Sequence, residues 1–342
     1  MVEAETPLMK RKSVILIGLA ALLIAAGIGG LRALHERQVV ASWTTNVVKH
    51  WDPNLSWRTN QENRRAGLRS IAPLATKVLR KDLNYESLLS RSRHKLPPWL
   101  VRWLDQWSSN ESRSPQTVRA DAAHHLGLLG PGARDALPDL IRHSGDLDDY
   151  TLITVALAIG SIAENTAEAR SALTMLMTNR NPHVSACAAF SLWRLDPSDT
   201  TVQRQLEPLI NEGSLVSLAG PLSDMGEAGK PLAAAVRRAF PQVKSVNTKI
   251  NVAYALWRMT GDAEAPLALV KSLSDEYEQP NRLPSDRAAR GRNSSHISSA
   301  ALVFEDISEC RAAQRPLLSQ LGSRGEHSLA EFKKIEKEQK ER

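Results

Sequence analysis

Cysteine is scarce in this sequence, with only Cys187 and Cys310 among 342 residues. The two lie far apart and form no CxxC motif, so neither a zinc site nor a disulfide framework is indicated. A single bridge between them is left open by the sequence. Because both fall within predicted helices that are not neighbours, we expect two free thiols.

Aromatic residues are also few, at 5% of the chain, whereas alanine and leucine are abundant. This composition favours closely packed helices over a β-sandwich. Apolar residues make up 42%, enough for a sizeable core in one large domain or two ordinary ones. The sequence therefore predicts an all-α protein.

Catalytic signatures are missing as well, since no GxSxG, HExxH, Walker or Rossmann glycine pattern occurs. The pair His124-His125 does not replace them. Adjacent side chains on a regular helix point about 100° apart, so both cannot bind one metal ion. We expect one surface histidine and one hydrogen-bonded interior histidine, and we predict no enzymatic activity, no cofactor and no metal.

The net charge of +7 is unevenly distributed along the chain. Residues 58–113 hold 12 basic and 5 acidic side chains, whereas residues 114–277 hold 14 and 18. The long C-terminal part is thus mildly acidic. This argues against a nucleic-acid groove running the length of the molecule, and no nucleic-acid partner is expected.

One long apolar run is present, the nineteen uncharged residues from Ser13 to Leu31. As a helix of about 1.5 Å per residue it would span roughly 28 Å, close to the hydrocarbon thickness of a bilayer. A cleavable signal peptide is the alternative, but its apolar region is usually shorter and ends at small residues. We predict an uncleaved transmembrane helix that acts as a signal anchor.

The charges beside this run predict its orientation. Lys10, Arg11 and Lys12 precede it, whereas Arg32 and Arg37 follow it. By the positive-inside rule the N-terminus lies in the cytoplasm and the main domain outside it. The expected location is single-pass in a bacterial inner membrane, with the domain on the periplasmic side.

A repeat follows over roughly residues 115–322. Residues 119–141 read RADAAHHLGLLGPGARDALPDLI, two amphipathic helical stretches that meet at a Gly-Pro-Gly stop. Degraded copies return at steps of 33, 33, 30 and 34 residues. The last inward residues of the successive first helices are Leu129, Ile162, Leu195, Met225 and Met259. The second helices are marked by Leu137, Leu173, Leu206, Leu232 and Leu267.

The phrase Ala-Ala-x-x-Leu-Gly-x-Leu-Gly that begins at Ala122, with Pro138 inside the second helix, resembles short bacterial HEAT repeats such as those of phycobilin lyases. The resemblance implies an α-solenoid, a superhelix of helical hairpins in which each pair buries its apolar stripe against the next. We expect second helices to line the concave face, which in such stacks binds extended partners.

These signals divide the chain into five parts. They are a cytoplasmic tail (1–12), the transmembrane helix (13–31), a helical juxtamembrane region with a candidate first repeat (32–114), the HEAT-like solenoid (115–325) and a charged, frayed C-terminal tail (326–342).

Two sets of tryptophans are candidate contact sites. In the juxtamembrane region Trp99, Trp103 and Trp107 share one helical face. That face either caps the first repeat, or lies among lipid headgroups while the basic residues Arg91, Arg93 and Lys95 meet anionic lipid. In the repeats, Trp193 and Trp257 occupy matching positions, and they either pack between repeats or act as recognition aromatics.

The function predicted from these features is a membrane-anchored HEAT-repeat scaffold or adaptor that binds a protein or peptide. The alternative is an enzyme or cofactor-handling protein on the same scaffold. A bilin lyase is the example that the resemblance implies.

Overall fold

The computed structural model describes residues 31–44, 57–84, 114–145, 148–278, 287–319, 321 and 323–341. Within these ranges the regular structure is entirely helical, which confirms the all-α prediction for them. The chain divides into two units, Met1–His50 and Trp51–Arg342. In the first unit, residues 31–44 are helical.

Several predicted segments lie outside the described residues. They are the cytoplasmic tail, residues 13–30 of the predicted membrane helix, and the juxtamembrane residues Trp99, Trp103, Trp107, Arg91, Arg93 and Lys95. Among the helices that are described, none combines the length and the apolar composition needed to cross a bilayer.

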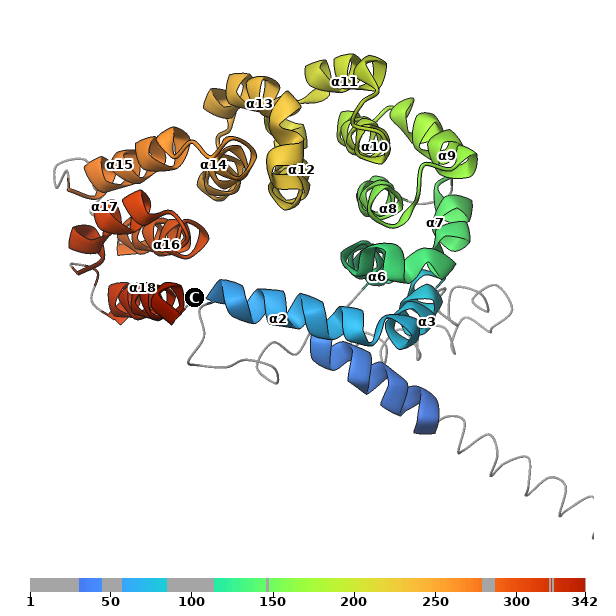
Figure 1. Cartoon of the computed structure of the whole chain (residues 1–342), viewed down its shortest axis with the longest axis horizontal. Coiled ribbons are helices and arrows are strands. Elements are labelled where there is room, and N and C mark those ends of the chain that lie inside the picture. The colour runs from blue at the N-terminus through green and yellow to red at the C-terminus, as the bar shows by residue number, and fades with distance from the viewer. Residues whose placement is uncertain are drawn as a thin grey trace, which may run out of the picture. The chain divides into compact units, whose positions relative to one another are not determined.

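The second unit starts with α2 (Trp57–Ser70) and α3 (Ala72–Leu83) and continues as a series of helix pairs (Figure 1). The pairs are α6 (Pro115–Leu129) with α7 (Leu137–His143), α8 (Asp149–Ile162) with α9 (Ala167–Met177), α10 (Pro182–Leu195) with α11 (Thr200–Leu206), α12 (Glu212–Met225) with α13 (Ala233–Ala239), and α14 (Val246–Thr260) with α15 (Glu264–Glu278). Helices α16 (Arg287–Val303), α17 (Ser308–Ser319) and α18 (Ser323–Glu341) follow.

The first helices of successive pairs pack on one another. Helix α6 contacts α8, α8 contacts α10, α10 contacts α12, and α12 contacts α14. We call these five helices the first row. Helices α7, α9, α11 and α13 lie together on one side of it (Figure 1).

Local sequence signals explain where the helices of the first row begin and end. Side-chain oxygens of Ser114, Asp148, Asn181, Asn211 and Ser245 accept a hydrogen bond from a backbone N–H in the first turn of the helix that follows each. Such caps satisfy N–H groups that have no partner within the helix. Gly130 and Gly226 end α6 and α12 with φ of 58° and 56°, values that L side chains rarely adopt.

The same packing recurs between neighbouring pairs because small residues meet there. A Cβ added to Gly127 would lie 3.2 Å from Cα of Ala158, and one added to Gly160 would lie 2.9 Å from Cα of Ser191. These positions are equivalent under the sequence repeat. Glycine thus lets α6 approach α8, and α8 approach α10, closely enough for backbone to meet backbone.

The C-terminal residues differ from the predicted frayed tail. Helix α18 extends to Glu341 and packs against α16 and α17. Phe332 and Ile335 are buried on one of its faces, and Phe332 packs in a core cluster with Phe304 and Leu318. The fraying was predicted from the high charge of this segment. Two apolar residues about one turn apart, Phe332 and Ile335, are nevertheless enough to pack the helix against the core.

The two cysteines are free and buried, Cys187 on α10 and Cys310 on α17. Burial raises the pKa of each thiol to about 12. Because the thiolate is the reactive form, both side chains are unreactive at neutral pH in the folded chain.

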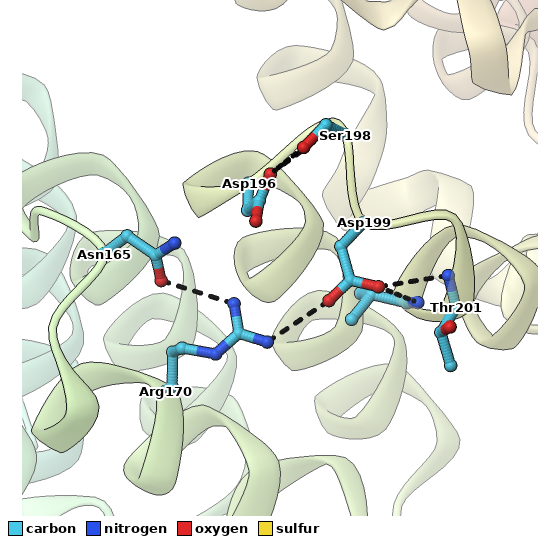
Figure 2. Close-up of polar contacts among 7 residues, drawn as sticks. Asn165, Arg170, Asp196, Ser198, Asp199 and Thr201 are labelled. Carbon is cyan, nitrogen blue, oxygen red and sulfur yellow. Dashed lines mark hydrogen bonds and ion pairs between the residues drawn. The ribbon is translucent and has the colours of Figure 1, made fainter.

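A polar junction joins the α8–α9 pair to the α10–α11 pair (Figure 2). The carboxylate of Asp199 accepts hydrogen bonds from the backbone N–H groups of Thr201 and Val202 at 3.0 and 3.1 Å, and so caps α11. It also lies 3.2 Å from Nη2 of Arg170 on α9. Nη1 of Arg170 donates to Asn165 Oδ1 at 3.3 Å.

This junction should weaken in acid. The N–H of Val202, followed by Arg170, lowers the pKa of Asp199 below its ordinary value of 3.8. The ionised carboxylate therefore stabilises the folded chain above that value, and its contribution is lost as the pH falls from there through the lower folded-state pKa. Unfolding followed by circular dichroism at neutral pH and near pH 3 should show less acid sensitivity in Asp199→Asn than in the unaltered chain.

Asp196→Asn is the control, because the Asp196 carboxylate bonds to Ser198 in its own loop. Equal acid sensitivity in all three chains would contradict this assignment.

Candidate functional site: a groove along the first row

A cavity of about 680 Å³ lies along the first row, with residues of α2 on its other wall. A second cavity of about 300 Å³ adjoins it at the α12–α14 end. The two share Arg65, Gly220, Asp224, Asn251 and Arg258. We refer to the two together as the groove.

The groove follows the sequence repeat. In each first helix the residue that precedes the last inward residue lines it, and these residues are Leu128, Ser161, Arg194, Asp224 and Arg258. Their spacing is the 33, 33, 30 and 34 residues of the repeat. The next residue is buried in three of the helices (Leu129, Ile162, Met259) and half-buried in two (Leu195, Met225). Because adjacent residues differ by about 100° around a helix, each of the five lies on a different face from that inward residue.

The second helices were expected to line the binding face, and this expectation was wrong for the groove. Its lining comes from α2, the first row, the short turn after α6 and Val303 of α16, and no residue of α7, α9, α11 or α13 takes part. Hydrophobic periodicity identifies the buried side of each helix. It does not identify which exposed side becomes hollow, since that depends on how the pairs stack.

Four arginines line the groove, and they differ in the hydrogen-bond and ion-pair partners of their guanidinium groups. Nη1 of Arg65 on α2 lies 3.2 Å from Oδ1 of Asp224 on α12. Nε of Arg69 donates to the carbonyl oxygen of Leu128 at 3.4 Å. Nη1 of Arg194 donates to the Ser161 hydroxyl at 3.0 Å. The guanidinium of Arg258 has no hydrogen-bond or ion-pair partner among the described residues.

Of the four groove arginines, Arg194 is the one most withdrawn from water. It is half-buried, and loss of solvent lowers its pKa, an effect that the charge of Asp224 partly offsets. The group that accepts its hydrogen bond is a neutral hydroxyl rather than a carboxylate. A guanidinium in this setting gains from an anion, because a charge-assisted hydrogen bond is about twice as strong as a neutral one.

The two histidines occupy different environments, as the sequence predicted. His124 is exposed and lines the groove, whereas His125 is half-buried with Nδ1 2.7 Å from the carbonyl oxygen of Asp121. Partial desolvation, and then the neighbouring His125, lowers the pKa of His124. His124 is therefore largely neutral at pH 7, and the positive charge of the groove comes from the arginines.

Small and apolar residues complete the groove. Gly220 leaves open space in the lining, since a Cβ there would meet no atom within 4 Å, whereas Gly127 and Ala158 line the groove where α6 and α8 touch. The side chain of Val216 on α12 is 65% exposed, and Leu157 lies on α8. The groove thus offers both apolar surface and cationic groups.

The predicted site residues are placed differently from one another. Trp193 is fully buried, and Trp257 is partly buried with its ring centroid 5.4 Å from that of Tyr254. Neither tryptophan lines the groove. The residues after them, Arg194 and Arg258, do. The sequence signal for these arginines was the Trp-Arg pair repeated at matching positions, in which the tryptophan was predicted as the contact residue and the arginine was not.

Among the described residues, no group of three or more His, Cys, Asp or Glu side chains could hold a metal ion. Comparisons with protein-family models, with curated proteins and with solved structures give no match to this chain. What the chain binds is therefore inferred from the groove itself.

Proposed function

We propose that this chain is a membrane-anchored scaffold of HEAT-like helical pairs whose groove holds an extended segment of a partner protein. The observation that carries the proposal is the repeat register of the groove, in which equivalent residues of five successive pairs line one cavity. The uncharged run of residues 13–31 would tether the scaffold, with the repeats outside the cytoplasm.

Two features support a stack of repeats. Contacts run from each first helix to the next along the first row. Equivalent glycines also make equivalent contacts, since a Cβ at Gly130 would lie 3.7 Å from the Ser161 carbonyl oxygen and one at Gly226 would lie 3.8 Å from that of Arg258. Junctions that recur in this way support the proposed solenoid.

The length of the groove favours an extended ligand over a small molecule. Neighbouring packed helices are about 8–10 Å apart, so the four steps from α6 to α14 cover roughly 30–40 Å. An extended peptide advances about 3.3 Å per residue, and about ten residues would fill that length. Catalysis by contrast needs a compact set of reactive groups, which the groove residues do not form.

A photo-crosslinking residue placed at Val216 tests the proposal in native membranes. Met175 on α9 is the matched control, because it is also an exposed apolar side chain, 49% accessible against 65% for Val216, but lies outside the groove. We expect a discrete protein adduct at Val216 and none of comparable yield at Met175, with mass spectrometry identifying the partner. Absence of a Val216 adduct, together with a bound chromophore in the absorbance spectrum of the purified chain, would favour the cofactor-handling alternative instead.

A further inference from the structure

The charge of the groove has the opposite sign to that of the repeats that form it. Residues 114–277 carry 14 basic and 18 acidic side chains. The groove nevertheless contains four arginines, against Asp224 and, at its α14 end, Glu62. Arg194 and Arg258 thus belong to the net-acidic repeats, whereas Arg65 and Arg69 lie on α2, in the basic segment 58–113.

The pairing within the groove leaves two of these charges available. Asp224 pairs with Arg65 of α2 and also acts on Arg194 through its charge, so one carboxylate is shared between two of the arginines. Arg194 and Arg258 stand on either side of it in the register, one on α10 and the other on α14. Arg194 is matched by a neutral hydroxyl, and Arg258 by no described side chain.

From this arrangement we infer that the groove recognises an acidic peptide segment, whose carboxylates pair with Arg194 and Arg258 while its apolar side chains cover Val216 and Leu157. The inference rests on the proposed function and specifies its ligand chemistry. Arginine suits this role because its planar fork can bind a carboxylate through two parallel hydrogen bonds. The steps α10 to α12 and α12 to α14 separate the two arginines by roughly 16–20 Å, or about six residues of extended peptide.

A nucleic acid fits the groove less well than a peptide. Single-stranded binding uses exposed aromatic side chains on which bases stack, together with a basic surface that continues along the strand. Two rings line the groove among the described residues, that of Tyr254, which is only 7% exposed, and that of His124, which is exposed. One exposed ring is not the series of stacking platforms that a single strand needs, and the repeats are net acidic.

The test uses the full chain and three fluorescent probes in anisotropy titrations. They are a decapeptide of alternating glutamate and leucine, the same peptide with glutamine in place of glutamate, and a ten-nucleotide single-stranded DNA. The glutamate peptide should bind the tightest, and added salt should weaken its binding. In R194Q/R258Q its affinity should fall about tenfold for each arginine removed.

The double variant R180Q/R238Q is the matched control. It removes the same net charge from two exposed arginines outside the groove, and its affinity should stay within about twofold of the unaltered chain. Circular dichroism melting of all chains reports folding, and R258Q alone, at an exposed position, serves if the double variant is less stable.

Equal binding of the glutamine peptide, or an unchanged affinity in R194Q/R258Q and R258Q, would overturn the inference. Tighter binding of the DNA that is lost in R194Q/R258Q would also overturn it, in favour of a nucleic-acid site. A protein adduct at Val216 in a chain that ignores the glutamate peptide would leave the scaffold function standing and refute only the acidic chemistry.

Discussion

Replacing Trp193 with alanine should lower the free energy of unfolding by about 3–5 kcal/mol, the cost typical of removing a large buried aromatic side chain. Trp193 is fully buried on α10, with the ring of Phe190 at a centroid distance of 6.3 Å. Its indole N–H has no hydrogen-bond partner among the described residues. The loss therefore comes from packing, and chemical unfolding followed by circular dichroism measures it.

Two other variants separate packing from recognition. Trp193→Phe should lower the free energy of unfolding much less than Trp193→Ala does. It keeps most of the apolar volume, and it leaves no hydrogen-bond partner of the indole unsatisfied. Trp257→Ala should cost less than Trp193→Ala, since Trp257 is only partly buried. If Trp193→Ala unfolded at the denaturant concentration of the unaltered chain but lost binding of the partner, Trp193 would be a recognition residue and the packing assignment would be wrong.

Gly160→Ala should destabilise the chain more than Gly220→Ala. Both glycines lie inside first-row helices, Gly160 on α8 and Gly220 on α12. A Cβ at Gly160 would lie 2.5 Å from Cβ of Ser191 and 2.9 Å from its Cα, whereas a Cβ at Gly220 would meet no atom within 4 Å. The first position is a junction between helices and the second is open.

Overpacking at Gly160 should cost about 1–3 kcal/mol, and the preference of helices for alanine offsets up to about 1 kcal/mol of it. At Gly220 that preference is opposed by the contact between the new Cβ and the ring of Pro221, the next residue, so the net change should stay within about 1 kcal/mol. Unfolding curves of the two variants, recorded side by side, measure the difference. Equal stabilisation by both substitutions would show that α8 and α10 do not pack through Gly160.

The helices and their boundaries were largely predictable from sequence. The predicted last inward residues Leu129, Ile162, Leu195 and Met225 are the last residues of α6, α8, α10 and α12, and Met259 precedes the end of α14 by one residue. This agreement has a physical basis, because capping residues and glycine stops act locally and are visible in the sequence.

The site itself was much less predictable. The contact between Arg65 and Asp224 joins residues that are remote in sequence, and no local pattern indicates it. Arg194 and Arg258 are separated by two repeats, and only the stacking of the pairs brings them to one groove. Net charge did not predict the groove either, because residues 114–277 are acidic on average although two of their arginines line it.

Competition at Val216 tests most directly whether the groove is the surface that holds a partner. The photo-crosslinked adduct is measured in native membranes with and without an excess of the glutamate–leucine peptide. We expect a discrete adduct at Val216 that disappears when the peptide is added, while the background at Met175 stays unchanged. An adduct of equal yield at Met175, or no adduct at Val216 in any condition, would contradict it.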